Sequence, residues 1–324
     1  MEKHAKIYIA GHRGLVGGAI LRKLQIDGYT NLVTRTHGEL DLLDQPAVNS
    51  FFEKEKPEYV FLAAAKVGGI GANSTYPADF IYQNTMIGFN VVHAAYKNNV
   101  KKLINLGSSC IYPRMASQPL KEEYLLTDLL ESTNEAYAVA KINVLKLCTF
   151  YNKQYGTNFL SAMPTNLYGP GDNYDSNGSH VLPAFIRKFH EAKVGQTDTV
   201  NLWGDGSPRR EFLFSDNLAE ALVMLMQKYD AGDLSNSAGD FINIGSGKDV
   251  TIKELAEKVR DVVYNTIPNK NCRIVWDSSK PNGTPQKLLD ISRITALGFS
   301  PKISLTEGIK LAYRDFINSL PEGS

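Results

Sequence analysis

Short apolar runs alternate with longer helix-compatible segments through the first half of the chain. The runs predict strands at residues 6–10, 31–35, 57–65, 102–107 and 158–163. The segments between them predict helices at residues 19–25, 49–54, 78–98 and 136–151. Strands that alternate with helices in this way form parallel sheets with both faces covered. The pattern therefore predicts an α/β fold with a doubly wound parallel sheet.

The regular alternation ends after Gly171. The later residues predict a polar loop at 173–179, helices at 181–190, 218–228, 251–264 and 305–320, a hairpin at 200–206, a strand at 240–245 and a cationic, turn-rich loop at 280–287. We expect residues 1–170 to form one domain, with residues of about 212–245 returning to it. Residues 171–324 should form mainly a smaller C-terminal α/β substrate-binding domain.

Composition narrows the class of protein. The 324 residues are enough for two domains or one large interwoven unit. A net charge of +1 indicates neither nucleic acid nor membrane as a partner, and no apolar run reaches membrane-spanning length. The N-terminus enters a strand directly, unlike a signal peptide. Cys110, Cys148 and Cys272 are odd in number and lack metal-site spacing, so we expect no metal and a reducing, cytoplasmic setting.

A glycine-rich turn joins the first predicted strand to the first predicted helix. Gly11, Gly14 and Gly17 follow one another as Gly-x-x-Gly-x-x-Gly. Glycines allow a tight turn and a close approach of backbone to a pyrophosphate, and the N-terminus of the following helix favours its negative charge. Strand, glycine turn and helix together predict a dinucleotide site of the Rossmann type. A plain strand-to-helix turn is the alternative.

The end of the second predicted strand indicates which dinucleotide binds. An NAD site would carry an acidic residue there for the ribose diol. This chain has Arg35 at that place, His37 follows it, and Arg13 lies within the glycine turn. Guanidinium groups suit a phosphate, so we expect NADP(H). A solvated arginine at a strand end is the alternative for Arg35.

A candidate proton relay lies farther along the chain. Tyr137 and Lys141 are four residues apart in a helix-compatible segment, so their side chains share one face. Ser108 ends the strand predicted at 102–107. A nearby ammonium lowers the pKa of a phenol, and we expect Lys141 to do this for Tyr137. Together the three suit proton transfer to a carbonyl under reduction, although the Tyr/Lys spacing alone also fits a surface lysine near a half-buried tyrosine.

Nine segments carry a resemblance to a known family. They are residues 11–17 (GHRGLVG), 63–70 (AAAKVGGI), 76–84 (YPADFIYQN), 106–113 (LGSSCIYP), 137–141 (YAVAK), 163–170 (MPTNLYGP), 179–181 (SHV), 210–212 (REF) and 280–285 (KPNGTP). With these segments the chain resembles the extended short-chain dehydrogenase/reductases and, more closely, the GDP-L-fucose synthase family, nearly from end to end. The glycine and Tyr/Lys motifs are typical of the whole superfamily, whereas Ser-Ser-Cys and Ser-His-Val are more specific.

The resemblance implies roles for individual residues. Catalytic positions are Ser108, Tyr137 and Lys141 for reduction and Cys110 and His180 for epimerisation. Substrate positions are Ser108, Lys188, Trp203, Arg210 and Lys287, with Arg210 and Lys287 against the diphosphate. Cofactor positions are Gly11, Arg13, Gly14, Leu15, Val16, Gly17, Arg35, His37, Asp41, Leu42, Ala63, Ala64, Leu106, Gly107, Lys141, Pro164, Asn166, Leu167 and His180. Lys188 and His37 stand where the family has arginine usually or often.

Position alone gives Cys110 and His180 plainer roles. A cysteine just past a strand end is commonly a small buried apolar residue, and a histidine at a helix start is commonly a cap or a surface residue. The resemblance, by contrast, implies that Cys110 removes protons from the sugar and that His180 returns protons to the other face, which needs a base on one side and an acid on the other.

The resemblance also implies a reaction and an assembly. It implies NADPH-dependent epimerisation at C3 and C5 and reduction at C4 of GDP-4-keto-6-deoxy-D-mannose, giving GDP-L-fucose. It implies a homodimer with a four-helix interface from residues 84–98 and 136–151. Two alternatives stay open. One is a 4-keto-reductase, with partial or no epimerisation, of a related GDP-deoxysugar or GDP-6-deoxyheptose. The other is a non-catalytic NADP-binding regulator, against which the intact Ser/Tyr/Lys set argues.

Overall fold

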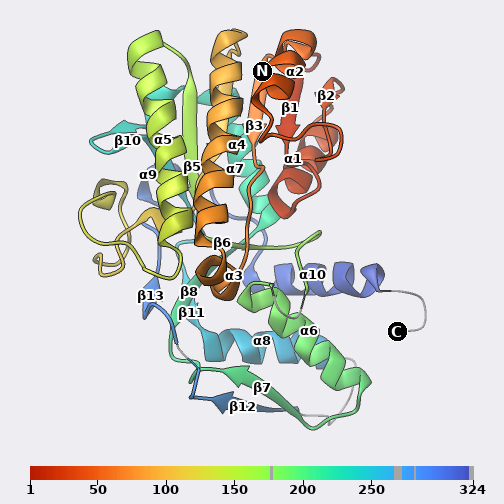
Figure 1. Cartoon of the computed structure of the whole chain (residues 1–324). Coiled ribbons are helices and arrows are strands. Elements are labelled where there is room, and N and C mark those ends of the chain that lie inside the picture. The colour runs from red at the N-terminus through yellow and green to blue at the C-terminus, as the bar shows by residue number, and fades with distance from the viewer. Residues whose placement is uncertain (176–177, 266–271, 281, 321–324) are drawn as a thin grey trace.

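A seven-stranded sheet forms the larger part of the protein in the computed structural model, which describes residues 1–175, 178–265, 272–280 and 282–320 (Figure 1). Its strands, in spatial order, are β2 (Leu32–Val33), β1 (Ile7–Ala10), β3 (Tyr59–Leu62), β4 (Lys102–Leu106), β5 (Phe159–Pro164), β10 (Gly239–Ile244) and β9 (Ser235–Asn236). Every neighbouring pair is parallel except β9 with β10. The sheet confirms the predicted fold class.

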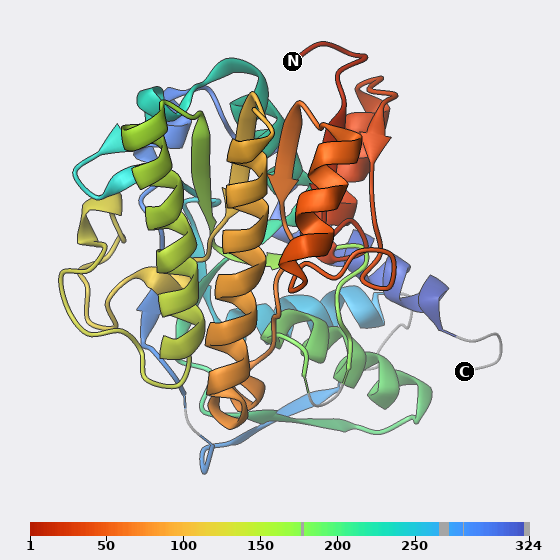
Figure 2. The same cartoon turned by 45° about the horizontal axis from the view of Figure 1, so that its top comes forward.

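Helices cover both faces of this sheet (Figures 1 and 2). One face carries α1 (Leu15–Ile26) and α7 (Ser215–Lys228), and the other carries α2 (Gln45–Glu55), α4 (Pro77–Lys97) and α5 (Glu135–Tyr155). Strand β1 shows why both layers form, because its side chains point alternately to opposite faces. Ile7 and Ile9 belong to the core beneath α1 and α7, whereas Tyr8 and Ala10 belong to the core beneath α2, α4 and α5.

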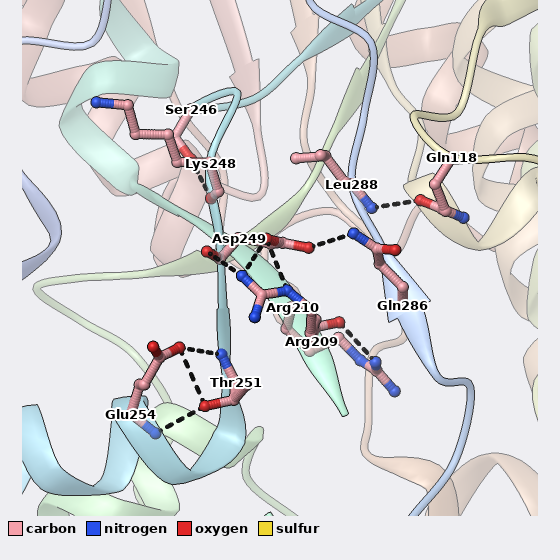
Figure 3. Close-up of polar contacts among 10 residues, drawn as sticks. All are labelled: Gln118, Arg209, Arg210, Ser246, Lys248, Asp249, Thr251, Glu254, Gln286 and Leu288. Carbon is pink, nitrogen blue, oxygen red and sulfur yellow. Dashed lines mark hydrogen bonds and ion pairs between the residues drawn. The ribbon is translucent and has the colours of Figure 1, made fainter. Parts of the chain in front are cut away.

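The smaller part has its own core below the sheet in Figure 1. Its helices are α6 (Val181–Val194), α8 (Ile252–Tyr264) and α10 (Leu305–Ser319), and its strands are β6 (Asn166–Tyr168), β7 (Thr199–Trp203), β8 (Arg209–Phe214), β11 (Asp249–Thr251), β12 (Arg273–Asp277) and β13 (Gln286–Lys287). The remaining short elements are α3 (Ile70–Thr75), α9 (Ser292–Ala296) and 3₁₀ turns at Ser109–Ile111, Glu122–Tyr124 and Ala231–Leu234. Thr251 and Glu254 form a capping box that starts α8 (Figure 3).

The hairpin expected at residues 200–206 is wrong. Strand β7 instead pairs in parallel with β12, with Val200 opposite Ile274. Gly204 and Gly206 have φ values of +78° and +79° and turn the chain away from β7, and the chain then enters β8. The cationic loop expected at residues 280–287 is partly wrong as well, because Gln286 and Lys287 form β13 beside β8.

Three properties of the described residues bear on the class of protein. None of their helices combines the length and the apolar character needed to cross a membrane. Within the same ranges, no three His, Cys, Asp or Glu side chains come together as a metal site would require. Cys110, Cys148 and Cys272 are all buried and unpaired.

Candidate functional site

The glycine turn lies at the carboxyl end of β1 and fits a bound phosphate. Gly14 is the N-cap of α1, and its N–H donates to the Gly11 carbonyl at 3.0 Å. A Cβ atom on Gly17 would lie 2.1 Å from the Gly11 carbonyl oxygen, so a side chain there would fill the turn. The first turn of α1 has no acidic residue, which leaves its free N–H groups available to an anion.

The carboxyl ends of β3, β4 and β5 lie at the same edge of the sheet as the glycine turn. The Ala63 N–H donates to the Ala10 carbonyl at 3.1 Å, and the Gly107 N–H donates to the Ala162 carbonyl at 2.9 Å. Ala64 approaches Gly11 so closely that a Cβ atom on Gly11 would lie 2.7 Å from the Ala64 nitrogen. The cofactor positions from these strands, Ala63, Ala64, Leu106, Gly107 and Pro164, therefore share one edge of the sheet with the glycine turn.

Arg35 is less available to a phosphate than its position in the sequence predicts. Its guanidinium pairs with the Glu55 carboxylate at 2.6 Å, donates to the Thr34 carbonyl at 2.8 Å and lies 5.4 Å from the centre of the Phe51 ring. The Arg35 guanidinium is already paired, because a carboxylate twenty residues later in α2 contacts it. Its contact with the cofactor stays a prediction. Arg13, by contrast, is exposed.

The other cofactor positions expected near Arg35 lie in the loop between β2 and α2. His37 is exposed, and its Nδ1 lies 3.7 Å from an Asp41 carboxylate oxygen. The Leu42 carbonyl accepts a hydrogen bond from the buried Asn90 amide at 2.9 Å. The Glu39 carboxylate also lies in this loop and accepts hydrogen bonds from the Thr36 N–H at 2.7 Å and the Thr36 hydroxyl at 2.8 Å. Its pKa is lowered first by hydrogen bonds from the backbone and side chain of Thr36, and further by Arg35 and Arg13.

Ser108 and Cys110 occupy the turn that follows β4. The Ser108 hydroxyl accepts a hydrogen bond from the Cys110 N–H at 3.3 Å and thereby caps a short 3₁₀ turn. Cys110 is 6% exposed. Burial raises the pKa of its thiol, and Lys287, the Ser108 hydroxyl and Lys141 oppose that rise. These interactions place two lysines and one hydroxyl around the sulfur.

Tyr137 and Lys141 face this turn from the first half of α5. The Lys141 ammonium is buried and donates to the Leu106 carbonyl at 2.8 Å. It lies 5.6 Å from the centre of the Tyr137 ring, whose other neighbour is the edge of Phe80. Burial lowers the pKa of Lys141 to about 8, and the Cys110 sulfur opposes that change.

The expected lowering of the Tyr137 pKa is wrong. Burial raises this pKa, and negative charge on Cys110 raises it further. The expectation considered only the neighbouring ammonium, but Lys141 is itself buried and is hydrogen bonded to a backbone carbonyl. Removing water from a phenolate costs more free energy here than a cation at this distance returns. Tyr137 is therefore a protonated phenol at neutral pH.

His180 lies in the other part of the protein, as the N-cap of α6. Its side chain is exposed, yet desolvation by the surrounding protein lowers its pKa. The loop before it lies against the loop after β3, because a Cβ atom on Gly69 would be 3.6 Å from the Ser179 carbonyl oxygen. Its pairing with Cys110 stays a prediction.

Two cations meet on adjacent strands of the smaller part. Strands β8 and β13 are parallel with Lys287 opposite Arg210. Burial lowers the pKa of both groups, and Arg210 lowers that of Lys287 further while Cys110 and Glu131 oppose the change. Figure 3 shows the strands around them, with Gln286 donating to the Asp249 carboxylate at 2.6 Å. The pair could bind a diphosphate next to Cys110.

Two other expected substrate residues, Trp203 and Lys188, lie on β7 or bind to it. Trp203 at the end of β7 is 68% exposed, and Lys280 lies 5.7 Å from its ring centre. Lys188 on α6 donates to the Asn201 carbonyl at 3.0 Å, which ties it to the same strand. An exposed aromatic ring of this kind suits stacking on a nucleotide base. Their contact with substrate stays a prediction.

Residues 164–167 link the two parts of the site. Pro164 ends β5, and Asn166 and Leu167 begin β6, which pairs with β8. The Asn166 amide donates to the Glu211 carbonyl at 2.8 Å. Glu211 is a residue that the sequence analysis did not single out, although it stands between two residues of the Arg-Glu-Phe motif. Alternation along β8 was the available signal, because it points Arg210 and Glu211 to opposite faces.

Comparison with known proteins identifies the relatives of this chain. The model of the NAD dependent epimerase/dehydratase family matches residues 7–245. A putative GDP-L-fucose synthase 2 of Arabidopsis thaliana is 55% identical over 99% of this chain and 94% of its own length. The GDP-L-fucose synthase of Escherichia coli K12 is 51% identical over 97% of both chains. A solved GDP-mannoheptose C4 reductase from Campylobacter jejuni with NADP bound is 43% identical, covers 98% of this chain and 99% of its own, and has a TM-score of 0.89.

We predict that the chain binds NADPH more tightly than NADH and that Arg13→Ala removes much of the difference. A hydrogen bond to a charged group contributes roughly 1.5–3 kcal/mol, so the Kd for NADPH should rise about ten- to a hundredfold while the Kd for NADH changes little. Arg35→Asp should also narrow the difference, with some loss of stability because Glu55 loses its partner. Isothermal titration calorimetry measures both constants.

Arg22→Ala is the matched control. Arg22 lies on α1, the helix that begins in the glycine turn, but it pairs with Asp216 at 2.6 Å. Its loss should therefore leave the ratio of the Kd for NADPH to the Kd for NADH unchanged. Equal affinity of the wild type for NADPH and NADH would contradict the assignment.

Proposed function

Because the chain belongs to the NAD dependent epimerase/dehydratase family, we propose that it is an NADPH-dependent enzyme that epimerises GDP-4-keto-6-deoxy-D-mannose at C3 and C5 and reduces it at C4, giving GDP-L-fucose. The main support is one cluster in which the Tyr137/Lys141 pair, the Cys110 thiol and the Lys287 ammonium interact. A reductase of the same GDP-sugar would need the Tyr137/Lys141 pair and the cation but not the thiol. The thiol beside a diphosphate-binding cation is the feature that suits epimerisation.

The larger part of the molecule would bind the cofactor, and the smaller part would bind most of the substrate. Residues 1–170, with residues of about 212–245, would hold NADP(H) along the carboxyl edge of the large sheet. Residues 171–324 would mainly hold the GDP-sugar, with its diphosphate on Arg210 and Lys287 and its base near Trp203. NADPH, when bound, supplies the hydride that C4 receives.

Epimerisation needs one mobile proton shared between Cys110 and His180. Burial raises the pKa of the thiol and desolvation by the surrounding protein lowers that of the exposed imidazole, so the resting pair is neutral and the proton sits on sulfur. Transfer of this proton to His180 yields a thiolate and an imidazolium, and Lys287 and Lys141 favour the thiolate. The C4 ketone acidifies the C3 and C5 protons. Cys110 removes such a proton, His180 returns one to the opposite face, and the neutral pair is restored.

Reduction uses the groups at the start of α5. The phenol of Tyr137 is protonated at neutral pH, as a proton donor to the C4 oxygen must be. The Lys141 ammonium lies beside the ring and stabilises the phenolate that remains after transfer. The Ser108 hydroxyl, held by the Cys110 N–H, can donate to the same oxygen. Tyr137 and Ser108 thus act on the C4 oxygen, which gains negative charge during hydride transfer. Lys141 acts on the Tyr137 oxygen, which gains negative charge after proton transfer.

A second candidate function is 4-keto-reduction of a GDP-6-deoxyheptose with partial or no epimerisation. The likeness to the GDP-mannoheptose C4 reductase favours it. Both functions need the Tyr137/Lys141 pair and the two diphosphate cations. They differ in whether Cys110 and His180 invert carbon centres, and NMR of the product distinguishes them.

We also propose that the enzyme is a cytoplasmic homodimer that joins through α4 and α5. These helices lie side by side on one face of the sheet (Figures 1 and 2). Their outer surface carries Tyr82 and Phe89 on α4 and Phe150 on α5, with 62%, 37% and 59% exposed. A second copy would cover these rings in a four-helix interface, and three unpaired cysteines suit a reducing compartment.

The dimer predicts twice the mass of one chain in light scattering. Phe150→Glu would place a charge in the interface and should shift the mass toward that of a single chain. Ile26→Glu, which charges an apolar residue that is 81% exposed on α1, is the control and should leave the dimer intact. A monomeric wild type at micromolar concentration would refute the assembly.

Tyr137→Phe should abolish reduction and preserve NADPH binding. Loss of a general acid typically lowers the rate about 10²–10⁴-fold, and absorbance at 340 nm with NADPH and the keto sugar measures it. Tyr151→Phe removes a hydroxyl from the same helix, where it contacts His93 at 2.8 Å, and should keep wild-type turnover. Near-normal turnover of Tyr137→Phe would exclude Tyr137 from the mechanism.

Epimerisation and reduction should separate by mutation. In Cys110→Ser, solvent deuterium should no longer enter C3 and C5, because a serine hydroxyl is far weaker as a base than a thiolate. The ketone should still be reduced, giving a sugar with unaltered C3 and C5. His180→Asn should invert neither carbon, because delivery from the other face fails, and should exchange deuterium more slowly than the wild type, because the Cys110 thiol loses the acceptor of its proton.

Proton NMR in D₂O with the keto sugar and NADPH measures both effects, and the wild-type product tests the proposed function itself. GDP-L-fucose from the wild type is the expected result. A product with uninverted carbons from the wild type, or full inversion by Cys110→Ser, would favour the reductase instead.

A further inference from the structure

A buried carboxylate lies directly behind the two diphosphate cations. We propose that Glu211 is a positioning residue that holds Lys287 and Arg210 in place for the GDP-sugar and links them to residues 164–167 on the proposed cofactor side. The inference rests on the proposed function, because it deepens the assignment of this site to a nucleoside-diphosphate sugar. Glu211 does not itself contact the substrate.

The Glu211 carboxylate is surrounded by hydrogen-bond donors. Its side chain is fully buried, at 0% exposure. One oxygen accepts from the Gly247 N–H at 2.7 Å and, in a longer contact, from the Ser246 hydroxyl at 3.4 Å. The other oxygen accepts from the Leu289 N–H at 3.0 Å. The two backbone N–H groups can only donate, one to each oxygen, so the site requires an acceptor on both sides and matches a carboxylate rather than an amide.

The backbone around Glu211 is shaped to this carboxylate. A Cβ atom on Gly245 would lie 2.2 Å from the nearer Glu211 oxygen. Only glycine therefore lets the end of β10 approach it. The residues that follow Gly245 provide two of the three donors, so the carboxylate joins the large sheet to β8.

The third donor fixes the strand that carries Lys287. Strand β13 has only two residues, Gln286 and Lys287, and so few ladder bonds cannot hold a strand by themselves. Side-chain contacts hold it on both sides of Lys287. Gln286 donates to Asp249, the Leu288 N–H donates to the Gln118 side chain at 2.9 Å (Figure 3), and the Leu289 N–H donates to Glu211. Of these anchors, Glu211 is the one that is buried and adjacent to Arg210.

The backbone of Glu211 reaches the cofactor side. Its carbonyl accepts from the Thr165 hydroxyl at 3.2 Å and from the Asn166 amide at 2.8 Å. One residue thus touches the segment after β5, the end of β10 and the strand of Lys287. A shift of Glu211 would move the diphosphate cations relative to the nicotinamide-side segment.

The test uses Glu211→Gln and GDP as the probe. The amide keeps the volume but turns an N–H₂ group toward one of the backbone donors. We expect the Kd for GDP and the KM for the keto sugar to rise about tenfold, while the Kd for NADPH stays within about twofold. Calorimetry gives the binding constants, and initial rates separate KM from kcat.

Glu122→Gln is the matched control. Glu122 is also a buried carboxylate, at 2% exposure, but it accepts from the Asn243 N–H at 3.0 Å and pairs with Arg293. Its variant should lower thermal stability without changing GDP affinity. Equal weakening of GDP binding by both variants would reveal a general structural effect and overturn the proposal.

A double-mutant cycle asks whether Glu211 acts through the cations. In a Lys287→Ala background, Glu211→Gln should weaken GDP binding much less than it does in the wild type. Additive effects would overturn the proposal. If Glu211→Gln fails to fold, Glu211→Asp keeps the charge but shortens its reach, and it should weaken GDP binding in the same selective way. Unchanged GDP affinity in either folded variant refutes the inference.

The GDP measurement also separates this inference from the proposed function. A wild type that binds no GDP refutes the proposed function. A wild type that binds GDP and converts the keto sugar, with a Glu211→Gln variant that binds GDP equally well, refutes only the role of Glu211.

Discussion

The hydrogen bond from the Lys141 ammonium to the Leu106 carbonyl is the contact on which the geometry of the site depends. A buried ammonium without a partner would cost several kcal/mol, so this 2.8 Å contact fixes α5 against the end of β4. Ser108 follows Leu106 by two residues, and Tyr137 precedes Lys141 by one helical turn. The same contact therefore sets the position of the phenol relative to the turn that carries Ser108 and Cys110.

Burial of this cluster decides its protonation states. Desolvation raises the pKa of the Tyr137 phenol and of the Cys110 thiol and lowers that of the Lys141 ammonium, in each case disfavouring charge. The result is a set of neutral proton donors around one charged lysine, whose pKa of about 8 keeps it mainly protonated at neutral pH. Such a site can donate protons to an oxygen or a carbon. It does not need a phenolate before the reaction starts.

Local patterns predicted the sheet and the inner cofactor edge, because alternation and glycine spacing depend on neighbours in sequence. The same patterns failed where the partner is distant. The partner strand of β7 begins seventy residues after it ends, so a hairpin was the nearest local explanation. The ion pair between Arg35 and Glu55 has no local signal either, because Glu55 meets Arg35 only after α2 has packed on the sheet. The pKa of Tyr137 follows from burial, which a spacing of four residues does not report.

Strand β8 shows how one short segment can serve both binding and positioning. Side chains alternate along a strand, so Arg210 can face the diphosphate site while Glu211 turns into the core. The cation needs an accessible, adaptable environment, whereas the carboxylate needs a closed shell of donors. Adjacent positions with opposite directions satisfy both needs. Strand β8 also pairs with β6 and with β13. Any displacement of β8 would therefore move β6 on the cofactor side and β13 on the substrate side together.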